Sequence, residues 1–290
     1  MYRYDADLEF LGEMTNEDLA LLANVIIFDP KDQKKRLTEG VTSTEEYQKY
    51  GKQYKMYWKV LAEELQKYGG DSIVNVLRGG KGVLYKEILL DAASKVADDL
   101  DKKASVIDIE NNYIKSLLDK AFDKMSEDEK KAFLSEIYSA CLEKNLKGFA
   151  DNLLSVMKEG SKQALNFLLK NLSDAVSSLT KSMGTAVGRS IGLALVPILL
   201  NNIFGVASAT AAKEATKGAF MVATLGSQAV ASGGTEGADG AGMTKEKGVI
   251  AAIILGLCLL PTFTSKALRV TIPACFIVAM LRIKYLSEHQ

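Results

Sequence analysis

Residues 248–281 read GVIAAIILGLCLLPTFTSKALRVTIPACFIVAML, and this stretch decides the fold class. Two apolar segments, 248–260 and 267–281, are separated by a break that begins with Pro261, and the second segment contains Pro273. A membrane-spanning helix needs about 20 predominantly apolar residues, whereas shorter runs are typical of buried core helices or re-entrant segments. The sequence therefore predicts a helical hairpin that is either central in a helix bundle or membrane-facing.

Small residues recur at every fourth position in the apolar region before this hairpin. They are Gly184, Gly188 and Gly192, followed by Ala207, Ala211, Ala215, Ala219 and Ala223. On a helix each set lines one face, along which a second helix can approach to backbone contact. Glycine costs about 1 kcal/mol relative to alanine inside a helix, so three in register indicate that close packing is required. Such faces pack helices in lipid and also in tight soluble pairs, and the spacing leaves both readings open.

Charge is distributed unevenly along a chain whose net charge is zero. Residues 1–184 contain 27 Lys/Arg and 31 Asp/Glu, whereas residues 185–290 contain nine and five. The pattern predicts a short N-terminal helical module at 1–30, a charged helical domain at 31–184 and an apolar Gly/Ala-rich helical region at 185–290. The last region includes a flexible loop at 233–242, where glycine is abundant. The neutral bulk charge argues against a nucleic-acid partner.

Helix-start signals are frequent in the charged part of the chain. Thr15 with Asp18, Ser43 with Glu46, and Ser126 with Glu129 have the spacing of N-terminal caps. The apolar periodicity predicts helices ending near Asp29 and spanning about 43–68, 85–100, 107–124, 127–146 and 149–183, the last broken near Gly160. No segment alternates cleanly with a period of two, so the fold class is predicted as an all-α multi-helix bundle.

No enzyme signature is complete. The glycine-rich segment 69–82 contains Gly80-Lys81 followed by Gly82, whereas a phosphate-binding loop requires Ser or Thr at that position. A single histidine, His289, makes histidine-dependent catalysis and zinc binding improbable. The three cysteines form no CxxC pair and are expected to be reduced thiols. We therefore expect a non-enzymatic protein without metal or cofactor.

Two groups of residues are candidates for contacts with other molecules. A partner or an anion could be contacted by Trp58, Asp71, Arg78, Lys81 and Tyr85, although aromatic residues at helical spacing are more often core. Anionic lipid headgroups could be contacted by the basic residues that flank the hairpin, which are Lys245, Lys247, Lys266, Arg269, Arg282 and Lys284.

The central block of the chain resembles the YaaW-type proteins of bacteria. The resemblance rests on Trp58, Glu64-Leu65-Gln66, Gly69-Gly70-Asp71-Ser72-Ile73, Asn75, Leu77-Arg78-Gly79, Gly82, Leu84-Tyr85 and Ile88-Leu89-Leu90-Asp91. Similar segments occur at Asp7–Leu11, Asp18–Ala20 and Arg269–Ala274, so it covers most of 5–145 and a patch near 269–283. The loop Arg78–Gly82 is one residue longer than in that family, and the apolar region 185–266 is expanded.

This resemblance implies a helical, non-enzymatic protein. The family is loosely grouped with the ubiquinol–cytochrome c chaperones, which are helical assembly factors, and it carries no catalytic residues that could be transferred to this chain.

The leading functional hypothesis is a non-enzymatic helical protein that associates with or inserts into membranes, as a pore-forming or membrane-perturbing effector. The alternative is a soluble chaperone-like or adaptor protein whose apolar hairpin is a buried core or an oligomer interface. Its partner would be membrane lipid or another protein, including a second copy of the chain. Because no signal peptide opens the sequence, the expected location is the bacterial cytoplasm or the inner face of its membrane.

Overall fold

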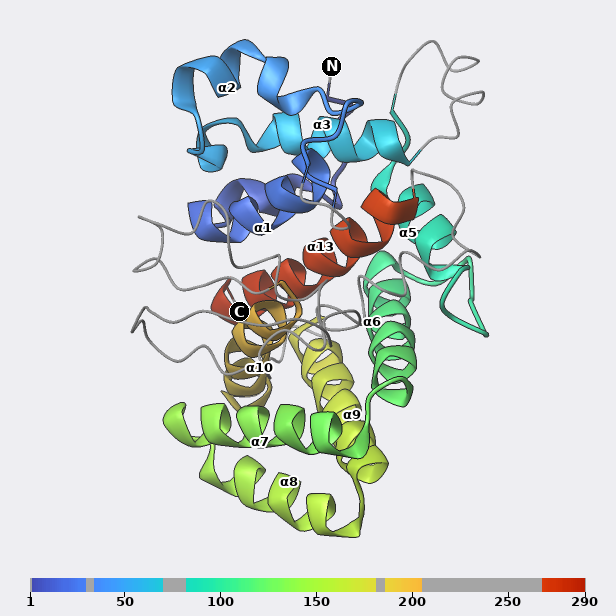
Figure 1. The fold of residues 1–290 in the computed structure, drawn as a ribbon, viewed down its shortest axis with the longest axis vertical. Coiled ribbons are helices and arrows are strands. Elements are labelled where there is room, and N and C mark those ends of the chain that lie inside the picture. The colour runs from blue at the N-terminus through green and yellow to red at the C-terminus, as the bar shows by residue number, and fades with distance from the viewer. Residues whose placement is uncertain (1, 30–33, 70–81, 181–185, 205–267, 290) are drawn as a thin grey trace, which may run out of the picture.

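The computed structural model describes residues 2–29, 34–69, 82–180, 186–204 and 268–289. These residues form helices and no strand, apart from one isolated bridge between Phe28 and Lys35, so the predicted all-α fold is confirmed. Figure 1 shows the helices around a central one, α13 (Leu268–His289), with α1–α3 at one end of the molecule and α7–α8 at the other.

The helices follow one another from the N-terminal end of the molecule to the far end, and the chain then returns to the centre. The N-terminal elements are η1 (Glu9–Glu13), α1 (Asn16–Ile27), η2 (Val41–Ser43), α2 (Glu45–Tyr50), η3 (Tyr54–Tyr57) and α3 (Trp58–Tyr68). The remaining elements are α5 (Tyr85–Ala93), α6 (Val106–Asp123), α7 (Glu127–Glu143), α8 (Lys147–Glu159), α9 (Ser161–Thr180), α10 (Ala186–Phe204) and α13.

Two of the three predicted caps are confirmed. Thr15 and Ser126 begin α1 and α7 with complete capping boxes. In each box the carboxylate of Asp18 or Glu129 accepts a hydrogen bond from the backbone N–H of the cap residue. The prediction of Ser43 was wrong by one residue, because Thr44 accepts the bond from the Tyr47 amide.

The predicted continuous helix over 43–68 was also wrong. The chain forms η2, α2, η3 and α3 instead, and Gly51 separates α2 from η3 with a φ of 56°. That left-handed conformation suits glycine and ends a helix. Gly160, with a φ of 155°, ends α8 before α9, so the predicted break near this residue is confirmed. The helix expected to reach residue 100 stops at Ala93.

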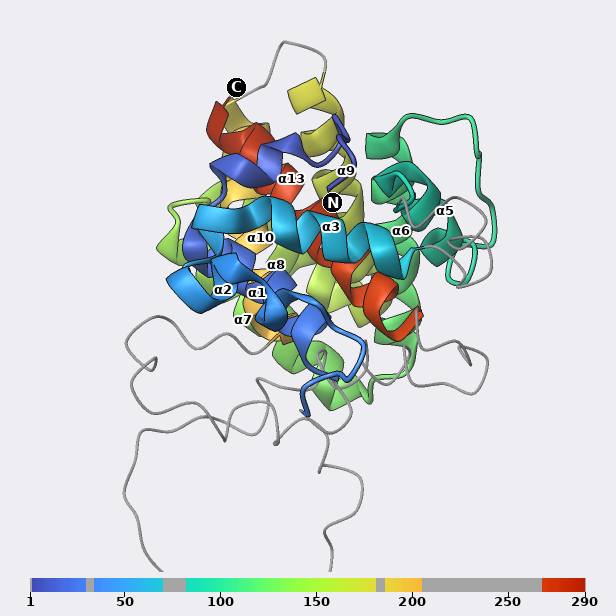
Figure 2. The same cartoon turned by 90° about the horizontal axis from the view of Figure 1, so that it is seen from above.

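Helix α13 is apolar on all sides, and 16 of its 22 residues are buried. A helix of this kind belongs inside a protein core or a membrane. Here it packs against α1, α3, α5, α6, α9 and α10, and Figure 2 shows α3 lying across it. By length and hydropathy α13 could cross a membrane, but 83% of its most apolar window is buried inside the protein. The other predicted arm of the hairpin, 248–260, lies outside the described residues, as do the break at Pro261 and the loop 233–242.

The small-residue face of α10 meets α13 at Gly192. A Cβ placed on this glycine would overlap Ser287 Oγ and would lie 3.3 Å from Ser287 Cβ. The predicted close helix approach therefore occurs at Gly192, inside the helical body. Gly184 and the alanines from Ala207 to Ala223 lie outside the described residues.

Candidate functional site

Among the described residues, a cluster of buried charged groups surrounds Arg282 near the end of α13. Its Nε donates to Glu110 Oε2 of α6 at 2.7 Å, and its Nη2 donates to the Asp7 backbone carbonyl at 2.6 Å. The guanidinium carbon lies 4.6 Å from the centre of the Phe10 ring. The side chains of Arg282 and Glu110 are only 10% and 4% exposed, so this ion pair is shielded from water.

Tyr85, at the start of α5, continues the cluster. Its hydroxyl donates to Glu110 Oε1 at 2.8 Å, and its backbone amide donates to Asp5 Oδ2 at 2.6 Å. Both oxygens of the Glu110 carboxylate therefore accept bonds, which a buried charge requires. The cluster joins the N-terminal segment, α5, α6 and α13.

A second ion pair lies two residues further along α13. Lys284 Nζ lies 2.9 Å and 2.7 Å from the two carboxylate oxygens of Asp18, the residue that also completes the cap of α1. Asp18 thus links the start of α1 to the end of α13.

The proline inside α13 is compensated by a neighbouring residue. Pro273 has no N–H, so the carbonyl four residues earlier, that of Arg269, lacks its usual helical donor. Arg36 Nη2 lies 3.5 Å from that carbonyl oxygen, and the Tyr113 hydroxyl donates to the Ile272 carbonyl at 2.7 Å. These bonds hold the first half of α13 as the ion pairs hold the second.

Burial controls the ionisation of these groups. It raises the pKa of Glu110, and Arg282 opposes that rise. Burial alone would lower the pKa of Arg282, but Glu110, Tyr85 and Asp7 together outweigh burial and the pKa is raised. Burial and the neighbouring Glu110 raise the pKa of Tyr85 well above its usual value. Arg282 therefore stays charged and Tyr85 stays protonated as a donor.

The arrangement around Arg282 stabilises the fold by linking distant segments of the chain. Each of these polar groups bonds another group of the protein, and a substrate would have to displace those bonds. The two cysteines that the structure describes are buried and free; burial raises the pKa of Cys275 well above its usual value and that of Cys141 to about 11. Neither forms the thiolate that a nucleophile needs at neutral pH. Among the described residues no group of three His, Cys, Asp or Glu side chains could hold a metal ion.

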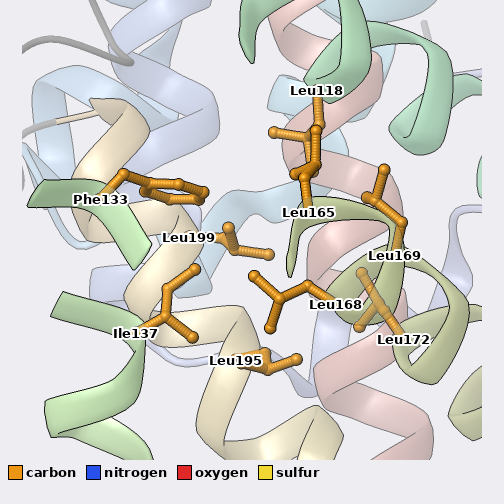
Figure 3. A pocket seen from close by; sticks show the side chains of 9 residues that line it. All are labelled: Leu118, Phe133, Ile137, Leu165, Leu168, Leu169, Leu172, Leu195 and Leu199. Atoms are coloured by element: carbon orange, nitrogen blue, oxygen red, sulfur yellow. The ribbon is translucent and has the colours of Figure 1, made fainter. Parts of the chain in front are cut away.

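A small pocket with a cavity volume of about 10 Å³, the space of about one water molecule, lies between α6, α7, α9 and α10 (Figure 3). Its lining is entirely apolar and consists of Leu118, Phe133, Ile137, Leu165, Leu168, Leu169, Leu172, Leu195 and Leu199. The pocket offers no group that could activate a substrate or fix the orientation of a ligand.

The predicted contact residues occupy varied positions. Tyr85 is fully buried, and Trp58 is half-buried with its ring 5.7 Å from that of Tyr2. Arg282 and Lys284 bind carboxylates of the protein, so in this conformation neither faces lipid headgroups. Arg269 is half-buried at the start of α13. Asp71, Arg78, Lys81, Lys245, Lys247 and Lys266 lie outside the described residues.

Sequence reasoning missed the acidic partners of this cluster, which are Glu110, Asp18 and Asp5. Glu110 lies on the same face of α6 as Tyr113, Ile114 and Leu117, all of which are buried. The sequence does show that Glu110 shares a helical face with apolar residues, which indicates a buried carboxylate. Such a carboxylate needs a cation nearby, and the sequence does not identify which one.

Comparison with known proteins places the chain in a family. A UPF0174 protein of Helicobacter pylori J99 is 33% identical over 284 residues, which cover 98% of this chain and 93% of the relative. The chain belongs to the UPF0174 family. The UPF0174 protein YaaW of Escherichia coli K12 is 35% identical over 139 residues, covering 47% of this chain and 58% of YaaW. Residues 2–37 match a domain of unknown function, DUF3944. No solved structure matches the chain.

The predicted resemblance to YaaW-type proteins is thereby confirmed. The grouping with ubiquinol–cytochrome c chaperones stays a prediction, and so does the division into three regions. The DUF3944 match includes Asp5, Asp7, Phe10 and Asp18, which bind or contact the cations of α13 or the α5 residue Tyr85.

Proposed function

We propose that this UPF0174 protein is a non-enzymatic helical adaptor of the bacterial cytoplasm, in which α13 is the core of the helical body. The observation that carries the proposal is the enclosure of α13 by six helices, with both of its C-terminal cations bound to carboxylates. The chaperone-like grouping implied by the YaaW resemblance agrees with such a role.

Energetics favour α13 remaining in the body. Breaking a buried ion pair by withdrawing one partner costs about 3–5 kcal/mol, because the other charge is left without compensation. Moving α13 into a bilayer would withdraw Arg282 from Glu110 and expose the apolar faces of α1, α5 and α6 that now cover it.

Membrane association is the competing function, and the length and hydropathy of α13 favour it. Insertion of α13 would require the surrounding helices to separate. In that state the interior of the body would be open and the environment of Trp58, the only tryptophan, would change.

A flotation experiment separates the two functions. The full-length protein is mixed at low salt with vesicles of phosphatidylcholine and phosphatidylglycerol, and Trp58 emission is recorded before and after. The adaptor proposal predicts that the protein stays at the bottom of the gradient with unchanged emission. Flotation together with a shift of the emission maximum would support membrane insertion instead, and a second copy as partner would be detected by light scattering of the unfloated protein.

A further inference from the structure

A lysine-rich face is formed by the segment in which α2 and η3 lead into α3; Figures 1 and 2 show where α2 and α3 lie. Residues 47–60 read YQKYGKQYKMYWKV and contain four lysines and no carboxylate. The lysines are Lys49, Lys52, Lys55 and Lys59, and all four are exposed. Lys52 lies in the turn after α2, Lys55 lies on η3 and Lys59 lies in the first turn of α3, so the three lysines fall within eight residues of the chain.

Aromatic side chains of the same segment contact one another between these lysines. Tyr54 and Tyr57 are 6% and 4% exposed, and their ring centres lie 5.9 Å apart. The ring of Tyr50 stacks on that of Tyr57 at 6.5 Å, and Lys49 Nζ lies 4.9 Å from the Tyr50 ring centre. The rings of Tyr50, Tyr54 and Tyr57 therefore pack together, while the lysines between them are exposed.

Near Lys59 the face also contains aromatic and apolar side chains. Lys59 Nζ lies 5.4 Å from the Trp58 ring and 5.9 Å from the Tyr2 ring, and both rings are half-buried. Met56, between Lys55 and Trp58, is 59% exposed. Methionine and tryptophan are enriched at protein interfaces, where exposed apolar edges receive side chains of a partner.

The lysines of this face have no carboxylate within ion-pair distance in the part of the chain that the structure describes. Some other lysines do form ion pairs, such as Lys162 with Asp119 and Asp123, and Lys284 with Asp18. Unpaired charges of one sign on a surface create a potential that attracts the opposite charge. The face is complementary to a carboxylate-rich surface.

We propose that this face, formed by Lys52, Lys55, Met56, Trp58 and Lys59, binds an acidic segment of a protein partner. Carboxylates of the partner would meet the three lysines, and an apolar side chain would pack on Met56 and the Trp58 edge. The proposal rests on the adaptor function and names the chemistry of its partner. A nucleic acid is a poorer fit, because Tyr54 and Tyr57 are buried and their faces are not available to stack on bases.

The experiment measures binding of a fluorescein-labelled peptide of alternating Glu-Asp pairs with one central Phe and one Leu. The full-length protein is compared with the triple variant Lys52→Glu/Lys55→Glu/Lys59→Glu, with the neutral triple Lys52→Gln/Lys55→Gln/Lys59→Gln, and with Met56→Ala. The matched control reverses three exposed lysines at the other end of the molecule, Lys144→Glu/Lys147→Glu/Lys158→Glu. Circular dichroism and the midpoint of thermal unfolding verify that each variant is folded.

The expected result is saturable binding that weakens as salt rises. Relative to the wild type, affinity should fall roughly tenfold or more in the Glu triple and less in the Gln triple and in Met56→Ala. The control triple should bind as tightly as the wild type. No binding at low salt, or an equal loss in the control triple, would overturn the proposal. So would the finding that a dT20 oligonucleotide or phosphatidylserine vesicles bind through these lysines while the peptide does not.

The two proposals fail independently. If the peptide does not bind and the protein still does not float with vesicles, only the acidic-partner assignment is lost. If the protein floats and Trp58 emission shifts, the adaptor function is lost whatever the peptide does.

Discussion

Helices α13 and α8 differ in almost every property that determines where a helix lies. In α13, 16 of 22 residues are buried, whereas in α8 only Ala150 and Leu153 of 13 are. The apolar residues of α8 occupy one stripe, so one face packs on its neighbours and the rest is exposed. Those of α13 surround the axis, so the helix needs cover on every side. The comparison teaches that the cover of α13 comes mainly from the charged part of the chain, and that its few polar groups must find partners there.

The largest expected effect comes from the buried ion pair. We expect Arg282→Met to lower the free energy of unfolding by about 3–5 kcal/mol, because Glu110 is left buried without its cation. Urea unfolding followed by circular dichroism measures this change. On α8, Lys158→Met is the control and should change stability by less than about 0.5 kcal/mol, since its side chain is exposed.

The double variant Glu110→Leu/Arg282→Met sharpens this prediction. Replacing both charges by apolar groups should recover most of the lost stability, because no uncompensated charge remains. A double variant as unstable as Arg282→Met alone would contradict the account of the pair.

The same chemical change in the two helices gives the second comparison. Leu281 is fully buried on α13 and Leu154 is 36% exposed on α8. Leu281→Ala should cost about 2–5 kcal/mol through lost burial and the cavity left behind. Leu154→Ala should cost less than about 1 kcal/mol, because much of its side chain is already in water. Equal losses in thermal or urea unfolding would show that α13 is not the better-packed helix.

Glycine-to-alanine changes should have opposite signs in the two regions. At Gly192 the added Cβ would meet Ser287 of α13, so we expect a loss of about 1–3 kcal/mol from overpacking. At Gly148 on α8 nothing lies within 4 Å, so Gly148→Ala should stabilise by about 0.5–1 kcal/mol through helix propensity. Adding Ser287→Ala to Gly192→Ala should relieve part of the loss, and a stabilising Gly192→Ala would disprove the close approach.

The pH dependence of the Arg282→Met penalty is the smallest expected effect. Without Arg282 the raised pKa of Glu110 rises further, because only the hydrogen bond from Tyr85 then opposes the effect of burial. A raised folded-state pKa means that the folded protein binds more protons, so stability is lost as pH rises and regained as pH falls. The penalty should therefore shrink between pH 7 and pH 5, by at most about 1.4 kcal/mol per pH unit. A penalty that stays constant over this range would contradict a charged, buried Glu110.

Local features of the fold were predictable because they depend on neighbouring residues. Thr15 and Ser126 cap helices within four residues of chain, and the break at Gly160 follows from the conformation of one residue. The close approach at Gly192 was also indicated by its spacing from Gly188, although the sequence left open whether its partner lay in lipid or in protein.

The cluster around Arg282 could not be predicted, because its residues are distant in sequence. Arg282 and Glu110 are separated by 172 positions, and only the packing of α6 against α13 brings them together. The sequence suggested that the apolar run ended at Leu281 and that Arg282 and Lys284 flanked it. The helix instead continues to His289, so both cations belong to a buried or half-buried part of α13.

The account predicts most directly that α13 is the most protected helix of the protein. Native-state amide hydrogen exchange of the full-length chain measures this helix by helix. The central amides of α13, from Ala274 to Leu281, should exchange only through global unfolding, while those of α8 exchange through smaller openings of lower free energy. Exchange of α13 as fast as that of α8, or faster, would contradict the conclusion that α13 is the core.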